Sequence, residues 1–390
     1  MKKFFALFLI AVLSLSLALT GCGGKDSDSS GSSTAPPASS GSSSSGQSSS
    51  AEKSDKFNVA NIVNGNLGDK SFFDSAEAGL KKLKDDGLID YKTIELGGRD
   101  EDQPKWKDAV IETSESGEYD VIVCGTWQMV DIVYDVAPDY PDQKYLIYDT
   151  VVDLPNVVSI NYKQNEMGYL CGIFAATLTS CTDFDRINED KVIGFVGGGD
   201  MPVINDFLVG YIEGALAVDS DIKVDVRYTE SFVDTALGKE LATNMINNSK
   251  ADVVWGVAGL SGNGAAEAAN ELDAWFIGVD SDQELTFTGA QAELAKVTLT
   301  SGLKNIGDSF IWFFGELKEG KEHWGEELWL GLEVNGVGVV TDKNFKTVPQ
   351  EVQDATLKAR DDLLKGAINV GSAFGDSAVD VAALRNSVRP

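Results

Sequence analysis

Short runs of β-branched residues alternate with longer stretches of helical period along most of this 390-residue chain. The first series of predicted strands covers 57–63, 91–96, 120–124, 144–148 and 157–161, with helices at 71–84, 103–114 and 129–137 between them. After a helix at 166–178 come strands at 191–196, 223–228, 253–257 and 275–279, with helices at 203–218, 236–247 and 264–270. Such alternation is typical of parallel sheets with right-handed crossovers. The pattern predicts an α/β fold with two similar halves, joined near 161–165, and a cleft between them.

The first 55 residues differ from the rest of the chain. Lys2 and Lys3 precede an apolar run that ends at Leu19-Thr20-Gly21-Cys22, a pattern typical of a bacterial lipoprotein signal peptide over 1–21. The run is shorter than the roughly 20 residues of a membrane-spanning helix. Cys22 is then expected to carry the lipid that anchors the mature protein to the extracytoplasmic side of the cell membrane. The alternative is an ordinary cleaved signal with an incidental cysteine. Residues 22–55, rich in Ser and Gly, predict a disordered tether.

The length and the net charge of the remaining chain limit its number of lobes and its possible partners. Roughly 335 residues exceed what one hydrophobic core usually holds, which again favours two lobes. The formal net charge is -29, and removal of Lys2 and Lys3 takes it to -31. A surface this acidic repels phosphate backbones, so no nucleic-acid partner is expected. Cys124, Cys171 and Cys181 allow at most one internal disulfide, and a Cys171–Cys181 bridge is left open.

The chain offers little machinery for catalysis. His323 is the single histidine, so a catalytic triad or a histidine-rich metal site is not expected. With 61 acidic residues, chance pairs of carboxylates are unavoidable, and acid/base chemistry by such a pair stays open. Gly197-Gly198-Gly199-Asp200-Met201-Pro202 resembles a dinucleotide-binding turn but has Pro202 where that motif needs Gly or Ala. We therefore expect neither an enzyme nor a cofactor.

Ligands of parallel sheets bind beyond the carboxyl ends of the strands. The loops expected there are 64–71, 125–128, 149–151, 197–202, 229–234, 258–264 and 280–283. Asp280 and Asp282 are placed to accept hydrogen bonds from hydroxyl groups, and Lys304 could complete a polar set or be an ordinary helix lysine. Asp69 could equally cap a helix, and Phe72 could belong to the core.

Six segments, taken together and in order, resemble the basic membrane protein family of ABC-transporter substrate-binding lipoproteins, whose best understood members bind purine nucleosides. They are Gly68-Asp69-Lys70-Ser71-Phe72, Met167 to Gly172, Gly194 to Gly198, Phe207 to Ala215, Ile277 to Gln283 and Thr300 to Asn305. The resemblance implies a type I periplasmic-binding-protein fold, in which two Rossmann-like lobes are joined by a multi-strand hinge. It places 56–163 and about 297–340 in lobe 1, and 164–296 and about 341–390 in lobe 2, so the chain should return to lobe 1 after about Val297.

The resemblance also implies roles for side chains. Phe72 and Phe232 match the aromatic residues that stack on the two faces of the base. Asp280 or Asp282 matches the positions that hold ribose hydroxyls, together with Lys304. The remaining expected ligand contacts are Asn64, Asp69, Ser71, Trp127, Asp149 and Gly259, with Asp149 as a base-edge acceptor and Gly259 allowing close backbone approach.

Two positions depart from the family pattern. Val63-Asn64 stands where nucleoside-binding members usually have Thr-Asp, which exchanges a pure acceptor for an amide that can also donate. Trp127 is bulkier than expected in its loop. The expected function is that of a monomeric receptor that delivers a nucleoside to an ABC permease. The alternatives are a ligand sensor that presents its closed form to a signalling partner, and a receptor for another aromatic solute such as a flavin.

Overall fold

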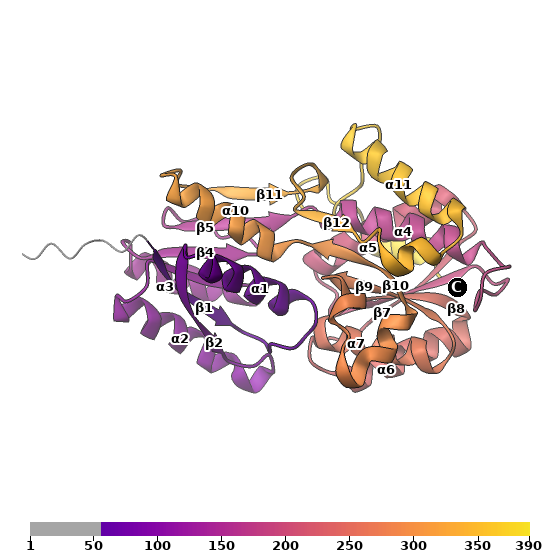
Figure 1. Ribbon diagram of the computed structural model, residues 1–390, viewed down its shortest axis with the longest axis horizontal. Coiled ribbons are helices and arrows are strands. Elements are labelled where there is room, and N and C mark those ends of the chain that lie inside the picture. Colours follow the sequence, from indigo (N-terminus) through magenta and orange to yellow (C-terminus); the bar gives the residue numbers. More distant parts are fainter. Residues whose placement is uncertain (1–55) are drawn as a thin grey trace, which may run out of the picture. The chain divides into compact units, whose positions relative to one another are not determined.

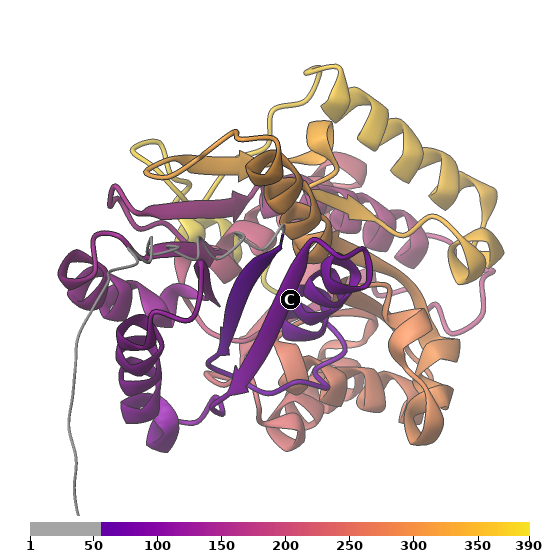
Figure 2. The same cartoon turned by 60° about the vertical axis from the view of Figure 1, so that its left-hand side comes forward.

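The computed structural model describes residues 56–390, and the predicted signal peptide, the lipidated Cys22 and the tether lie outside these residues. Two six-stranded sheets organise the described chain (Figure 1). The first is parallel throughout, in the order β11-β5-β4-β3-β1-β2. Its strands are β1 (Phe57–Val63), β2 (Ile89–Glu95), β3 (Val121–Gly125), β4 (Lys144–Tyr148), β5 (Val157–Tyr162) and β11 (Glu327–Leu330). Figure 2 brings the paired strands β1 and β2 forward.

The second sheet has the order β12-β10-β9-β8-β6-β7 and is parallel except for β12, which runs antiparallel to β10. Its strands are β6 (Val192–Gly197), β7 (Lys223–Tyr228), β8 (Ala251–Val257), β9 (Trp275–Asp280), β10 (Thr298–Lys304) and β12 (Val337–Val339). Every residue of β6, β8 and β9 is buried, as expected for strands covered on both faces. The predicted α/β fold with two Rossmann-like halves is confirmed.

Helices connect the strands and cover the sheets. With the first sheet lie α1 (Phe72–Asp85), α2 (Gln103–Ser116), α3 (Val130–Val136) and α10 (Ile306–Lys318). With the second lie α4 (Gln164–Thr179), α5 (Pro202–Val218), α6 (Thr235–Asn244), α7 (Gly259–Glu271), α8 (Gln283–Thr286), α9 (Ala292–Val297), α11 (Gln350–Leu364) and α12 (Val381–Ser387). We call the first sheet with its helices lobe 1 and the second lobe 2.

The chain crosses between the lobes three times in residues 56–390, after β5, after β10 and between β11 and β12. The return to lobe 1 comes after Lys304, a few residues later than the expected position near Val297. The reason is that 298–304 pairs in parallel with β9 and so extends the second sheet. Likewise, β12 lies in lobe 2 although residues up to about 340 were expected in lobe 1.

Four glycines bring α4 and α5 into backbone contact. A Cβ atom at Gly168 or Gly172 would lie 2.3 or 2.2 Å from a carbonyl oxygen of α5. A Cβ atom at Gly210 or Gly214 would lie 2.0 or 2.2 Å from the carbonyl oxygens of Asn165 and Tyr169. These glycines belong to two of the segments that carry the family resemblance. Their role is therefore to allow close packing of the two helices behind the second sheet.

Three cysteines occur in the described chain, and all are free: Cys124 and Cys171 are buried, and Cys181 is partly exposed. The Cys171–Cys181 bridge is not formed. Within residues 56–390, no group of His, Cys, Asp and Glu side chains could hold a metal ion. In the same part of the chain, every helix is too short or too polar to cross a membrane.

Candidate ligand-binding site

A cavity that is partly open to solvent lies between the two lobes, at the carboxyl ends of their strands. Each lobe supplies half of its lining. Lobe 1 contributes Asn64, Gly65, Asn66, Asp69, Phe72, Phe73, Gly98, Thr126, Trp127, Gln128 and Asp149, and lobe 2 contributes Val203, Ile204, Phe207, Phe232, Val233, Val257, Ala258, Gly259, Leu260, Asp280 and Lys304.

Phe72 is the first residue of α1 and lies on the lobe 1 side of the cavity. Tyr148, the last residue of β4, stacks on it with ring centroids 5.2 Å apart and an interplanar angle of 24°. Tyr148 fits there because Gly125 has no side chain, and a Cβ atom at Gly125 would lie 2.4 Å from the tyrosine ring. Phe73 packs edge-on against Phe72, at 5.1 Å. The orientation of the Phe72 ring is therefore fixed by its neighbours before any ligand binds.

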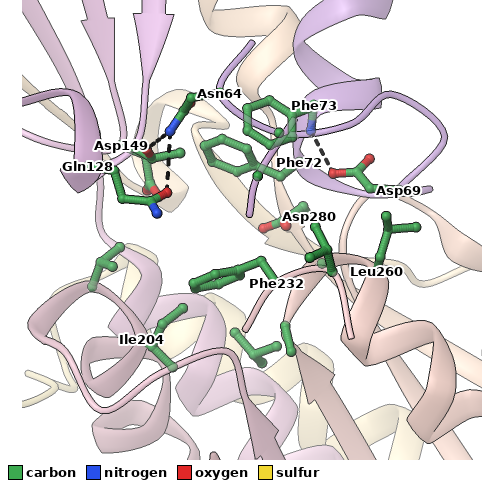
Figure 3. A pocket seen from close by; sticks show the side chains of 18 of the residues that line it. Asn64, Asp69, Phe72, Phe73, Gln128, Asp149, Ile204, Phe232, Leu260 and Asp280 are labelled. Atoms are coloured by element: carbon green, nitrogen blue, oxygen red, sulfur yellow. Dashed lines mark hydrogen bonds between the residues drawn. The ribbon is translucent and has the colours of Figure 1, made fainter. Parts of the chain in front are cut away.

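Phe232 enters the cavity from lobe 2, opposite Phe72 (Figure 3). Its ring lies over Gly198, where a Cβ atom would come within 2.2 Å of it. The Phe232 carbonyl approaches Gly259, whose φ of +54° lies in the left-handed region that favours glycine. Gly198 thus makes room for the Phe232 ring.

Asp69 lines the cavity, but its carboxylate is occupied. The two oxygens accept hydrogen bonds from the backbone N–H groups of Ser71 (3.0 Å), Phe73 (2.9 Å) and Asp74 (3.2 Å). Burial raises the pKa of Asp69 to about 6, against the lowering effect of these donors. Asp69 therefore caps α1, which is one of the two interpretations left open from the sequence, and it thereby holds Phe72 in position.

A buried charged cluster forms part of the cavity wall. Lys304 Nζ is 2.5 Å from Asp149 Oδ1 and 4.5 Å from the centroid of the Phe207 ring. Burial raises the pKa of Asp149, and the nearby Lys304 charge opposes this shift. Burial also raises the pKa of Asp280, to about 7, again opposed by Lys304. Lys304 and Asp149 are in direct contact and so belong to one cluster. The family resemblance instead implies that Lys304 contacts the ribose and Asp149 contacts the base.

Neutral polar groups form another part of the wall. Asn64, which follows β1, donates from Nδ2 to Thr126 Oγ1 (2.8 Å) and to Gln128 Oε1 (3.3 Å). Figure 3 shows Asn64 and Gln128 to one side of the Phe72 and Phe232 rings and Asp280 toward the other side. The Trp127 side chain lies at the edge of the cavity and remains 47% exposed.

The loop Gly68–Ser71, which we call the latch loop, is held by four side chains of lobe 2. Asn263 donates to the carbonyl of Asp69 (3.2 Å), and Ser281 donates to that of Ser71 (3.1 Å). Gln283 and Thr286 both donate to the carbonyl of Lys70, at 3.3 and 3.2 Å. The two lobes are thus in contact across the cavity in this structure.

Nine of the eleven residues predicted to bind ligand line the cavity: Asn64, Asp69, Phe72, Trp127, Asp149, Phe232, Gly259, Asp280 and Lys304. Ser71 and Asp282 do not. Ser71 is the last residue of the latch loop and is buried outside the cavity lining, and Asp282 precedes α8, two residues after the cavity-lining Asp280. The sequence prediction missed Thr126, Gln128, Phe207 and Tyr148. Thr126 and Gln128 both lay in the loop 125–128, which was expected to face the cleft, and Phe207 lay in one of the segments that carry the family resemblance.

A family model described as "ABC transporter substrate-binding protein PnrA-like" matches residues 56–373. The chain is 30% identical over 326 residues to basic membrane protein D of Borreliella burgdorferi, covering 82% of this chain and 89% of that protein. It is 30% identical over 387 residues to the ABC transporter nucleoside-binding protein BmpA of Lactococcus lactis, covering 95% and 99%. A solved solute-binding protein of an ABC transporter system from Aeropyrum pernix K1 has the same fold, with a TM-score of 0.69 and 24% identity over 85% of this chain and 99% of that one.

Proposed function

This chain belongs to the PnrA-like family of ABC transporter substrate-binding proteins, and on that premise we propose that it binds a nucleoside between its lobes and delivers it to an ABC permease. The nucleoside-binding relative from Lactococcus lactis, which the chain matches along nearly its whole length, supports this ligand class.

The observation that carries the proposal is the pair Phe72 and Phe232 on opposite lobes. A flat heteroaromatic ring between them would stack on both faces, and such stacking is worth about 1–3 kcal/mol per aromatic side chain. The charged cluster of Lys304, Asp149 and Asp280 offers both donors and acceptors for sugar hydroxyls. A nucleoside combines these two parts in one uncharged molecule.

Ligand binding is coupled to closure of the lobes. A ligand that touches Phe72 and Phe232 together stabilises only the closed arrangement, in which the latch loop also contacts lobe 2. Closure would create the surface that a permease recognises. The protein would act as a monomer held at the membrane by a lipid on Cys22, and it would release its ligand unchanged.

Isothermal titration calorimetry with inosine, adenosine, uridine, riboflavin, free hypoxanthine and ribose tests the proposal. We expect nucleosides to bind more tightly than hypoxanthine or ribose alone, because each part fills only half of the site. Phe72→Ala and Phe232→Ala should each weaken nucleoside binding by about tenfold to a hundredfold. Phe374→Ala, which removes a ring outside the cavity, is the control.

The ligand class, the role of the two phenylalanines and the absence of hydrolysis are tested separately. Tight binding of riboflavin with none of the nucleosides would reject the nucleoside and retain the receptor. Binding that is unchanged in both phenylalanine variants would reject the aromatic clamp. Chromatography of inosine after incubation with the protein should return inosine alone, and free hypoxanthine would show hydrolysis instead.

A further inference from the structure

Phe232 is carried by the loop 229–234, which connects β7 to α6. Its ring points into the cavity (Figure 3), and the next residue, Val233, also lines the cavity. Loops are usually the most mobile part of a fold, so a stacking ring on a loop needs contacts that hold the backbone. The close approach to Gly198 constrains the ring but not the backbone on either side of it.

Two buried hydroxyl groups hold this backbone. Ser261, the third residue of α7, is completely buried, and its Oγ donates to the Ser231 carbonyl (2.8 Å) and accepts from the Asp234 N–H (2.9 Å). Thr229 is also buried and donates from Oγ1 to the same carbonyl (2.6 Å). Ser261 therefore bridges the loop from one side of Phe232 to the other.

The backbone of this loop is strained. Glu230, which lies between Thr229 and Ser231, has a φ of +49°, in the left-handed region that is unfavourable for a residue with a side chain. The Glu230 side chain is exposed, so its own packing does not hold it there. A strained residue persists only where the surrounding structure over-determines it. Loss of a hydroxyl should therefore let the loop relax and move Phe232 with it.

We propose that Ser261 and Thr229 are positioning residues for ligand binding, which hold Phe232 in its stacking orientation before a nucleoside arrives. This inference rests on the proposed function. Neither residue is part of the cavity lining in the described chain, so both act through Phe232. Because Phe72 is held by Tyr148 on the opposite lobe, both rings of the aromatic clamp are then fixed in advance. A ring that is already ordered loses less conformational freedom on binding, which raises the affinity.

Calorimetry on Ser261→Ala, Thr229→Val and Thr229→Ser tests this, with whichever of inosine, adenosine and uridine binds wild type most tightly. Ser261→Ala removes a donor to Ser231 and the acceptor of Asp234, and should weaken binding about fivefold to thirtyfold. Thr229→Val keeps the side-chain shape and should weaken binding about threefold to tenfold, because Ser261 still holds the same carbonyl. Thr229→Ser keeps the hydroxyl and should bind like wild type.

Ser114→Ala is the matched control. Ser114 is a buried serine of lobe 1, outside the cavity lining, whose Oγ donates to the Val110 carbonyl (2.7 Å) and contacts the Tyr145 hydroxyl (2.8 Å). Its loss should lower the melting temperature, as Ser261→Ala does, but leave the affinity unchanged. In a Phe232→Ala background, Ser261→Ala should weaken binding by less than about twofold further, because the ring through which it acts is already gone.

Hydrogen exchange of the ligand-free protein gives a readout that does not depend on nucleoside binding. The Asp234 N–H should exchange faster in Thr229→Val than in wild type or Ser114→Ala, although its acceptor, Ser261 Oγ, is still present.

Unchanged affinity in Ser261→Ala, or its full loss repeated in the Phe232→Ala background, would overturn the positioning role while the nucleoside receptor stands. Equal losses in Thr229→Ser and Thr229→Val would do the same. A wild type that binds no nucleoside would overturn the proposed function. In that case faster exchange at Asp234 in Thr229→Val would retain the hold on the Phe232 loop, and unchanged exchange would overturn it too.

Discussion

Lys304 and Asp149 join the two lobes through a single buried ion pair, with 2.5 Å between Nζ and Oδ1. Lys304 ends β10 of the second sheet, and Asp149 follows β4 of the first. Their side chains are 2% and 10% exposed, so both charges have lost most of their water. Such a pair contributes little net stability, but either charge left alone is costly. Each charge therefore needs the other wherever the lobes are closed around it.

Lys304→Met should lower the unfolding free energy by about 3 kcal/mol, because it leaves Asp149 and Asp280 buried without a compensating positive charge. Thermal and denaturant unfolding measure the change. Lys296→Met is the control, since the Lys296–Glu293 pair is exposed and should contribute less than about 1 kcal/mol. Equal melting temperatures for Lys304→Met and wild type would contradict the assigned role.

Nucleoside affinity should rise between about pH 6 and pH 8. The pKa of Asp280 is raised to about 7, so the carboxyl is largely protonated below that pH, and sugar hydroxyls donate best to its ionised form. The folded chain also holds this proton more tightly than the unfolded chain, so the group's contribution to stability falls as pH rises through about 7. Titrations in buffers of different ionisation enthalpy should show proton release at pH 7. In Asp280→Asn this release should disappear, and its persistence would assign it elsewhere.

Thr286→Val should weaken binding of every nucleoside about fivefold without changing the order of preference. It removes one hydrogen bond to the Lys70 carbonyl, worth about 1 kcal/mol, from the closed arrangement alone. Thr288→Val is the matched control, because Thr288 is exposed and two residues further along. Stopped-flow measurements should place the change in the dissociation rate. A change in selectivity instead would mean that the latch loop touches the ligand.

Gly210→Ala should destabilise the protein by about 1–3 kcal/mol, because its Cβ atom would lie 2.0 Å from the Asn165 carbonyl oxygen. Gly315→Ala, in α10, meets nothing within 4 Å and should stabilise by about 0.5–1 kcal/mol through helix propensity. Denaturant unfolding of the two variants gives the comparison. Equal stabilities of Gly210→Ala and wild type would contradict the close packing of α4 on α5.

Most strands and helices were predictable because the hydrophobic period changes sharply along the chain. The strands 57–63, 144–148 and 223–228 begin and end where the sequence predicts. The helix expected at 264–270 begins earlier, at Gly259, because five of the residues 259–264 are glycine, serine or asparagine and read as a loop. Because the helix starts at Gly259, Gly259 and Leu260 line the cavity, whereas residues 261–264 do not.

Site residues could be predicted where a residue of their type is uncommon in loops, as an aromatic residue is. Phe72 and Phe232 line the cavity, as expected from the motifs that contain them. Gln128 and Thr126 could not be found in this way, because neutral polar side chains are common in loops and their pairing with Asn64 joins positions 62 and 64 residues apart. Tyr148 was read as an ordinary strand residue, since nothing local shows that it stacks behind Phe72. The choice between Asp280 and Asp282 depended on where the strand ends.

The chain crosses between the sheets three times, so each lobe is built from separate segments of the chain. A recombination event that replaced residues 56–163 would import β1 to β5 without their edge strand β11 or the helix α10 that packs on α1. Neither lobe therefore corresponds to one continuous segment of the chain. A ligand preference therefore depends on residues from both halves, which face each other across the cavity.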